Sequence, residues 1–415
     1  MGITPLKQAS ASNWQRTLWI IFFAQMMTAV GFSSINPFLP LYVKDLGSST
    51  NLSIELLAGL VYSAQAFTMM FAAPIWGTIA DRYGRKLMVE RSMFGGAIIL
   101  LLMAFVSSAE QLILLRAIQG VITGTVAASS ALVASIAPRK RMGFAMGLLQ
   151  VGLNSGVALG PVICGVVADA FGYSSSFYVT SALLLIAGVI IGIGVHEEFT
   201  PKEALREQGN KVAEKWRRIL LMPGVGMTYS VRFMAQLGRM MVIPILSLFA
   251  LELLPDAEGV NTFTGLVIGA GAATMTLSGI YLGRLGDQIG HRRVLIACFI
   301  LAGLLYLPQS LVTQGWQLLV LYALVGIGSG GIVPLVSALL ANYTPAGEEG
   351  AVYGLDNSIQ SGARSLSPLL GSAVALWFGL RSTFIATALV FFLGAVLAIW
   401  RLPQQPVDQD IQSEI

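Results

Sequence analysis

The sequence predicts an all-α membrane protein of twelve transmembrane helices arranged as two related six-helix bundles. Three observations lead to this fold class: the composition, the length of the apolar segments and an internal repeat. Of the 415 residues, 55% are hydrophobic and only 11% are charged, whereas a soluble domain carries roughly 25% charged residues. Because the mean hydropathy is +0.74, we expect a large apolar surface that faces lipid.

The apolar segments are long and continuous, as in MFGGAIILLLMAFV at 93–106. A spanning helix needs roughly 20 apolar residues, and within lipid only helices and closed barrels satisfy their backbone hydrogen bonds. Barrel strands are short and alternate in polarity, so helices are favoured. We expect them at 17–43, 53–79, 87–107, 111–136, 143–168, 174–195, 223–251, 262–283, 293–311, 315–341, 350–378 and 381–401.

One long charged segment, HEEFTPKEALREQGNKVAEKWRRILLM at 196–222, divides these spans into six and six. The predicted organisation is an N-terminal bundle at 1–195, a cytoplasmic linker at 196–222, a C-terminal bundle at 223–402 and a polar cytoplasmic tail at 403–415.

The two halves repeat at an offset of 206 or 207 residues. The matched pairs include Gly77 with Gly283, Asp81 with Asp287, Pro37 with Pro244, and Pro161 with Pro368. A constant offset through many matches indicates two structurally similar units. Parallel halves of this kind are a recurring plan of transporters, with the substrate site between them near the middle of the membrane.

The distribution of basic residues predicts the orientation. Most Lys and Arg fall in the termini and in the loops that lie on the same side as the N-terminus. The positive-inside rule therefore places both termini in the cytoplasm of a multi-pass plasma-membrane protein. This topology also explains the net charge of +4, so we expect no nucleic-acid partner.

The sequence offers little for catalysis. Cys164 and Cys298 lie in separate apolar runs, and His196 and His291 lie in loops, without the spacing of a metal site. There is no nucleophile–base pair and no P-loop for ATP. We expect no enzyme activity, cofactor or metal, and a functional monomer whose partners are a small-molecule substrate, protons and the bilayer.

The stretch GTIADRYGRK at 77–86 is dense in charge, and GRLGDQIGHRR at 283–293 repeats it in weaker form. Its cations are explained by topology alone, but its glycines and its acid are not. A functional role is therefore expected for the residues of this motif, which are Gly77, Asp81, Arg82, Gly84, Arg85, Lys86 and Asp287. The alternative is that these cations only fix the loop inside.

This stretch resembles the signature G-x-L-A-D-R-x-G-R-K of the major facilitator superfamily, with Ile79 in place of Leu. RAIQGVITG at 116–124 and GVALGPVICG at 156–165 are similar to motifs of its fourth and fifth spans, the latter associated with proton-coupled antiporters. NPFLPLYVKDLG at 36–47 resembles the bacterial drug:proton antiporter branch. The resemblance implies that the charged motif is a gate that holds the halves together on the inner side. It also implies proton-coupled export by alternating access, and hinge and packing roles for Gly156, Gly160 and Pro161.

Asp356 is the acid that lies within an apolar span, with Gln360 and Arg364 on the same helix face at i+4 and i+8. A buried carboxylate can carry a proton near neutral pH, so Asp356 is our first candidate for proton coupling. The alternative is a structural acid near the inner gate.

Arg116 is a charged residue within a span, and such a residue usually faces a cavity or a partner. The resemblance implies that Arg116 helps to relay protons or shapes the cavity, so it is our second candidate for proton coupling. The alternative is that Arg116 pairs structurally or extends to the membrane interface.

Other polar residues follow helical faces of the spans. We predict that the substrate cavity is lined by Gln25, Asn36, Gln65, Gln150, Asn154, Arg232, Gln236, Arg239, Gln360 and Arg364. Any single one of them is more often a helix–helix hydrogen bond. Four Arg against one Asp within the spans favour anionic or neutral substrates.

The predicted function is secondary active export of small amphipathic compounds in exchange for protons. The first alternative is uptake or facilitated transport of a metabolite or organic anion. The least favoured alternative is a membrane receptor without transport activity.

Overall fold

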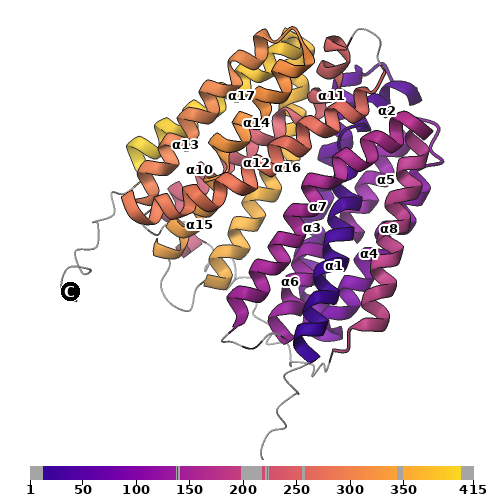
Figure 1. Cartoon of the computed structure of the whole chain (residues 1–415), viewed down its shortest axis with the longest axis vertical. Helices are drawn as coiled ribbons and strands as arrows, with labels where there is room; N and C mark the ends of the chain where they lie inside the picture. The colour runs from indigo at the N-terminus through magenta and orange to yellow at the C-terminus, as the bar shows by residue number, and fades with distance from the viewer. Residues whose placement is uncertain are drawn as a thin grey trace, which may run out of the picture.

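The computed structural model describes residues 13–136, 141–197, 224–254, 258–343 and 349–402, together with positions 138, 217–219 and 222. The predicted linker at 196–222 and the tail at 403–415 lie almost entirely outside these residues. In the part of the chain that is described, all regular secondary structure is helical. Figure 1 shows the helices of the two halves as two neighbouring bundles.

The N-terminal half contains eight helical segments, because two of its six predicted spans are each divided in two. They are α1 (Asn13–Ser34), α2 (Leu39–Leu46), α3 (Ile54–Tyr83), α4 (Arg85–Met103), α5 (Ala109–Ile122), α6 (Thr125–Ile136), α7 (Met142–Phe171) and α8 (Tyr173–Gly194).

The C-terminal half repeats this order. Its segments are α10 (Val225–Met241), α11 (Ile243–Leu253), α12 (Val260–Ile289), α13 (His291–Tyr306), the 3-10 helix η2 (Pro308–Leu311), α14 (Gly315–Ser329), α15 (Ile332–Tyr343), α16 (Glu349–Phe378) and α17 (Leu380–Arg401). Each of the twelve predicted segments is therefore helical.

The divided spans are the first, fourth, seventh and tenth, and the breaks occupy equivalent places in the repeat. Pro37 lies in the turn between α1 and α2, and its counterpart Pro244 lies in the first turn of α11. Proline has no N–H to donate, so it is tolerated at the start of a helix and interrupts its interior. Gly124, at φ +145°, separates α5 from α6, and Gly330 separates α14 from α15.

Several helices are joined by a single glycine. Gly84 and its counterpart Gly290 both have φ +98°, and Gly172 and Gly379 have φ +83° and +87°. These left-handed values favour glycine. Within the charged motif, Gly84 is consequently the single residue between α3 and α4. α3 continues to Tyr83 rather than ending near 79 as predicted, so most of the motif is helical.

Nine segments in the described residues are long and apolar enough to cross a membrane. The other three predicted spans do not meet these criteria of length and apolar composition, and their sequences show why. Four charged residues crowd the start of α4, a break shortens α5 and α6, and Glu349, Asp356 and Arg364 lie on α16. Twelve spans thus remain a prediction, although all twelve segments are helices.

The halves contact each other through α7 with α12 and through α3 with α16. We call the end of the molecule that carries Gly84 and Gly290 the motif end. The close approaches lie at the opposite end: a methyl group added to Gly165 would be 2.5 Å from the Asn261 carbonyl oxygen, and one added to Gly59 would be 2.9 Å from the Pro368 carbonyl oxygen. An apolar cluster of Leu41, Leu248, Ala250 and Val260 also joins the halves there.

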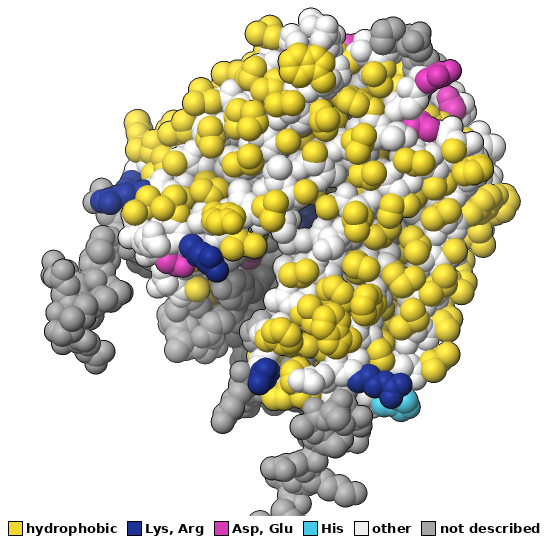
Figure 2. Space-filling model, in the orientation of Figure 1, with side chains coloured by type: hydrophobic (Ala, Val, Ile, Leu, Met, Phe, Trp, Pro, Cys, Tyr) yellow, Lys and Arg dark blue, Asp and Glu magenta, His cyan; other side chains and the backbone are white. Residues whose placement is uncertain are grey.

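Toward the motif end the helices lie farther apart. Methyl groups added to Gly147 on α7 or to Gly354 and Gly362 on α16 would meet no atom within 4 Å. Figure 2 shows the surface hollowed between the two bundles on this side, with Lys and Arg side chains near this end. One group of acidic side chains lies at the opposite end, and others lie beside the basic ones.

Candidate transport site

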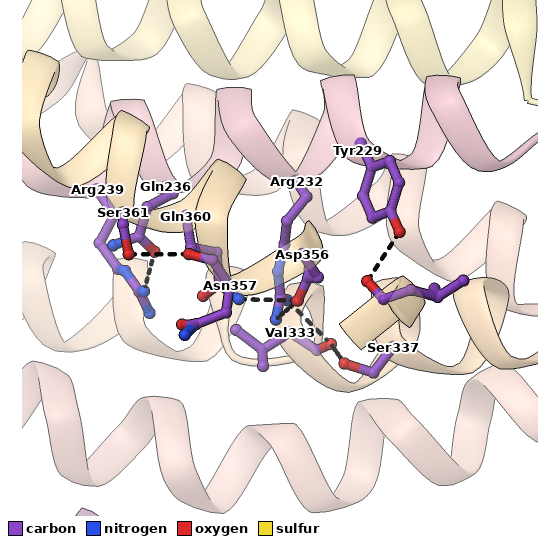
Figure 3. Close-up of polar contacts among 11 residues, drawn as sticks. Tyr229, Arg232, Gln236, Arg239, Val333, Ser337, Asp356, Asn357, Gln360 and Ser361 are labelled. Carbon is purple, nitrogen blue, oxygen red and sulfur yellow. Dashed lines mark hydrogen bonds and ion pairs between the residues drawn. The ribbon is translucent and has the colours of Figure 1, made fainter. Parts of the chain in front are cut away.

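A buried ion pair joins two helices of the C-terminal half (Figure 3). Arg232 on α10 and Asp356 on α16 are 6% and 4% exposed, and their Nη2 and Oδ2 atoms are 3.2 Å apart. A buried charge is tolerated when it is paired and hydrogen-bonded. The packing of α10 against α16 brings the two residues together although 124 positions separate them in the sequence.

Neighbouring groups donate to or accept from the ion pair, but they leave some of its hydrogen-bonding atoms without a partner among the described residues. Gln360 Nε2 donates to Asp356 Oδ2 at 2.8 Å, and Arg232 Nη1 donates to the Val333 carbonyl at 3.3 Å. Asp356 Oδ1 and Arg232 Nε are buried without a hydrogen-bond partner among the described residues. Such groups are costly unless something satisfies them, so this site has capacity for a further proton, donor or acceptor.

A small cavity extends from Arg232 along α10. It is lined by Arg232, Ala235, Gln236, Arg239, Met275, Ser329, Ile332, Val333 and Phe391. Arg239 donates to Gln236 Oε1 and to Met275 Sδ. The predicted stripe of Arg232, Gln236 and Arg239 is thus one wall of a single cavity, as helical spacing requires.

The polar lining of this cavity is rich in donors. Arg232 Nε, Arg239 Nε and Gln236 Nε2 are all buried and lack an acceptor among the described residues. The lining contains two guanidinium groups and no carboxylate. Its remaining walls are largely apolar, so the cavity combines a hydrophobic surface with an excess of positive charge.

Arg116 has a different environment in the N-terminal half. It is 4% exposed, which excludes the alternative that it extends to the membrane interface. Its Nε donates to the Val61 carbonyl at 3.2 Å and its Nη1 to Gln119 Oε1 at 2.8 Å, and it lies over the Tyr62 ring at 5.9 Å. All of these partners are neutral.

The remaining predicted cavity residues are dispersed. Gln25 is buried on α1 with Oε1 unpartnered among the described residues, and Gln150 donates to Asn154 Oδ1 at 3.0 Å on α7. The Asn36 carbonyl accepts from the Tyr62 hydroxyl at 2.6 Å. Gln65 lies half-buried on α3, and Arg364 lies exposed on α16. The structure therefore assembles Arg232, Gln236, Arg239, Asp356 and Gln360. Arg364 lies near enough to interact electrostatically with Arg232, Arg239 and Asp356, and the other predicted residues lie apart from this cluster.

The glycines predicted for hinge and packing roles bring α7 against two neighbours. Gly156 and Gly160 lie against Met26, Val30 and Ser33 of α1, where a side chain has no room. The Pro161 carbonyl faces Gly265 of α12 in the other half. α7 continues as one helix through Pro161, so this segment forms both an internal contact and the seam between the halves.

The two copies of the charged motif make different contacts. In the first copy, the backbone N–H groups of Arg85 and Lys86 donate to the Glu197 carboxylate at 3.1 and 2.7 Å. Lys86 Nζ donates to the Gly192 carbonyl, and Arg82 lies over Tyr83. The surroundings of Gly77 and the side chain of Asp81 are not among the described parts of the structure.

In the second copy, exposed Asp287 is 2.9 Å from His291. Arg292 donates to the Ile399 carbonyl at the end of α17, as Lys86 does to Gly192 at the end of α8. Both copies of the motif therefore keep a basic side chain that donates to a backbone carbonyl of a later helix. The contact of the Glu197 carboxylate with the start of α4 is described for the first copy.

Two residues of these networks were not predicted from the sequence. Gln119 is the direct partner of Arg116, and its i+3 spacing on the same helix was an available signal. Glu197 is the first acid after the sixth span, but its contact with residues more than a hundred positions earlier has no local sequence signal.

These features describe a helical membrane protein of two repeated halves with buried charges near their interior, which is the architecture of a secondary transporter. A sequence model of the Major Facilitator Superfamily matches residues 21–231 and 228–414. The chain belongs to this superfamily, and the resemblance drawn from its motifs is confirmed.

Curated relatives match along nearly the whole chain. The chain is 34% identical to "Multidrug resistance protein MdtG" of Serratia proteamaculans (strain 568) over 397 residues, covering 95% of both proteins. It is 34% identical to the protein of the same name from Dickeya zeae (strain Ech586) over 403 residues, covering 97% of this chain and 98% of the relative.

Solved structures support the fold. A bacterial homologue of the human lysosomal transporter Spinster, in an inward-facing and unoccupied conformation, matches with a TM-score of 0.75 at 12% identity, over 94% of this chain and 97% of that one. The human organic anion transporter MFSD10 (TETRAN) matches with a TM-score of 0.67 at 17% identity, over 93% and 99%.

Proposed function

We propose that this protein exports amphipathic compounds across the bacterial inner membrane in exchange for protons, and that Asp356 carries the exchanged proton. The relatives named multidrug resistance proteins support export of several compounds. The observation that carries the proton site is the buried Arg232–Asp356 pair beside a cavity, with one carboxylate oxygen unpartnered among the described residues.

In the proposed cycle, the motif end faces the cytoplasm, where the excess of basic residues belongs. The separation of the halves at this end and their contact at the other support an inward-facing state. The substrate enters from the cytoplasmic side, and the halves then rock to open the opposite end. We further propose that all twelve segments cross the membrane and that both termini lie inside.

Exchange requires that the proton and the substrate exclude each other. A substrate that presents a positive charge or a hydrogen-bond donor to Asp356 binds the ionised carboxylate and competes with the proton. Protonation from the outer side would then favour release. The excess of donors in the cavity supports a second candidate function, the uptake of organic anions.

For an anion the coupling has the opposite sign. An anionic group bound to Arg232 withdraws the guanidinium from Asp356, so the carboxylate takes up a proton when the substrate binds. Proton and substrate would then move in the same direction. The charge of the substrate and the direction of coupling are therefore linked through one ion pair.

Proton exchange on binding tests this directly. Purified protein in weak buffer with a pH indicator is mixed with a lipophilic cationic dye and, separately, with a lipophilic anionic dye. The proposal expects the cationic dye to release close to one proton per bound dye. Uptake of a proton with the anionic dye and no response to the cationic one would favour anion uptake instead.

Transport measurements complete the test. Uncoupler-sensitive dye efflux from cells supports export, and Asp356→Asn is expected to abolish transport driven by a pH gradient in vesicles. Asp45→Asn, which removes an exposed acid remote from the pair, is the matched control. Intact pH-driven transport in Asp356→Asn would exclude Asp356 as the proton carrier.

A further inference from the structure

The first turn of α12 has no capping side chain in its own sequence. Its N-cap is Gly259, in the left-handed region at φ +69°. The equivalent position in the first half is Ser53, whose Oγ accepts from the Leu56 N–H at the start of α3. The repeat has therefore kept a self-capped helix in one half and not in the other.

The missing cap is supplied by the opposite half. Asp169, near the end of α7, accepts from the backbone N–H of Asn261 at 3.3 Å, from Asn261 Nδ2 at 2.7 Å and from the backbone N–H of Thr262 at 2.7 Å. These N–H groups belong to the second and third residues of α12, which an N-cap side chain ordinarily satisfies. A carboxylate here also has favourable electrostatics with the helix dipole.

This contact lies on the seam that closes the end opposite the motif. Gly165, one turn before Asp169 on α7, leaves no room for a side chain against Asn261, and Gly265 lies against Pro161 one turn further along α12. Three hydrogen bonds across this seam converge on the Asp169 carboxylate.

We infer that Asp169 is a conformation-dependent cap that sets the balance between the inward-facing and outward-facing states. When the halves separate at this end, α12 loses its capping group, because Gly259 has no side chain to replace it. The outward-facing state thus carries an uncapped helix that the inward-facing state does not. The inference rests on the alternating-access part of the proposed function and is independent of the substrate and of proton coupling.

The test measures the conformation rather than transport. Spin labels are placed at Asn51 and Thr313, exposed positions in loops of the two halves at the sealed end. Cys164 and Cys298 are buried and stay in place. Distance distributions are recorded in lipid nanodiscs for the parent protein and for Asp169→Ala. We expect the long-distance, open population to rise about fivefold, the size of a typical cap effect.

Asp45→Ala is the matched control. It removes an exposed carboxylate from the same half and the same end, on α2, and is expected to leave the distribution unchanged. Asn261→Ala removes one of the three hydrogen bonds and is expected to raise the open population by about twofold. This milder variant keeps the test valid if Asp169→Ala folds poorly.

Hydrogen exchange provides the second readout. The amides of Asn261 and Thr262 should exchange faster in Asp169→Ala, whereas Leu56, capped by its own Ser53, should not change. A folded Asp169→Ala protein with the parental distance distribution would overturn the inference. Failure of the Asp356→Asn prediction would not affect the inference about Asp169, because neither the spin-label distances nor the hydrogen exchange involves a proton gradient.

Discussion

Arg116 and Arg232 are both buried arginines inside their bundles, but the two halves treat them differently. Arg232 lies against a carboxylate and beside a cavity, while Arg116 contacts a backbone carbonyl, an amide and an aromatic ring. The repeat has preserved the scaffold, including the helix breaks and the left-handed glycines at 84 and 290. It has not preserved the chemistry: among the described residues, the buried arginine of the C-terminal half has a carboxylate partner and that of the N-terminal half does not.

The largest expected effect compares these two arginines directly. Arg232→Gln leaves the Asp356 carboxylate buried without a counter-charge, which costs about 3–5 kcal/mol of unfolding free energy. Arg116→Gln leaves unpaired neutral groups and should cost about 1–3 kcal/mol. Thermal unfolding in detergent checks the difference. Equal losses would show that Arg116 has a charged partner after all, and the Arg232→Gln/Asp356→Asn double variant should recover much of the loss.

The two charged motifs give the next comparison. Asp81→Asn should lower the initial efflux rate about fivefold, if the acid interacts with a helix terminus or cation in the gate. Asp287 is exposed and paired with His291 on its own motif, and exposed pairs contribute little. Asp287→Asn should therefore change the rate less than about twofold. Equal effects of the two variants on dye efflux would argue against an asymmetric gate.

A smaller effect is expected at the start of α4. Glu197→Gln weakens the acceptor for the Arg85 and Lys86 amides, a contact comparable to an N-cap of about 1 kcal/mol. Hydrogen exchange at these two amides should accelerate about fivefold. His196→Gln, at the exposed neighbouring position, is the control. Unchanged protection in Glu197→Gln would mean that the helix start is held by other groups.

The smallest effect is a pH dependence at the end opposite the motif. Glu110, just before the predicted span at 111–136, accepts from Ser48 Oγ at 2.6 Å and from the Ser49 and Thr50 amides. The hydrogen bond from Ser48, followed by the other donors, lowers its pKa to about 2. Because the folded-state pKa is depressed, this contribution is full above the unfolded value of 4.5 and is lost as the pH falls toward 2.

A neutral capping box in the C-terminal half, at the start of the helix that corresponds to α5, provides the comparison. Gln314 and Gln317 form a capping box at the start of α14, which has no charge to titrate. Hydrogen exchange, corrected for intrinsic rates, should show protection at Ser49 and Thr50 falling between pH 5 and pH 2.5 while that at Gln317 is retained. Glu110→Gln should remove the difference, and loss of protection at both turns would indicate general acid unfolding.

The fold was largely predictable from the sequence, because lipid imposes its constraints locally. Long apolar runs become helices wherever backbone groups must be satisfied internally, and the near-constant offset between matched residues identified the two halves. The helix breaks were harder to predict from the sequence. The turn at Pro37 and the separation at Gly124 interrupt runs that read as continuous spans of 17–43 and 111–136.

The sequence by itself determined the family, the repeat and the helical faces that carry Arg232, Gln236 and Arg239, since these follow from local pattern and spacing. The tertiary structure decided which charges meet. Asp356 reaches Arg232, Glu197 reaches the start of α4, and Asp169 caps a helix of the other half. Each contact depends on how helices distant in the sequence pack together, and helix periodicity specifies a face without specifying the neighbour that it will touch.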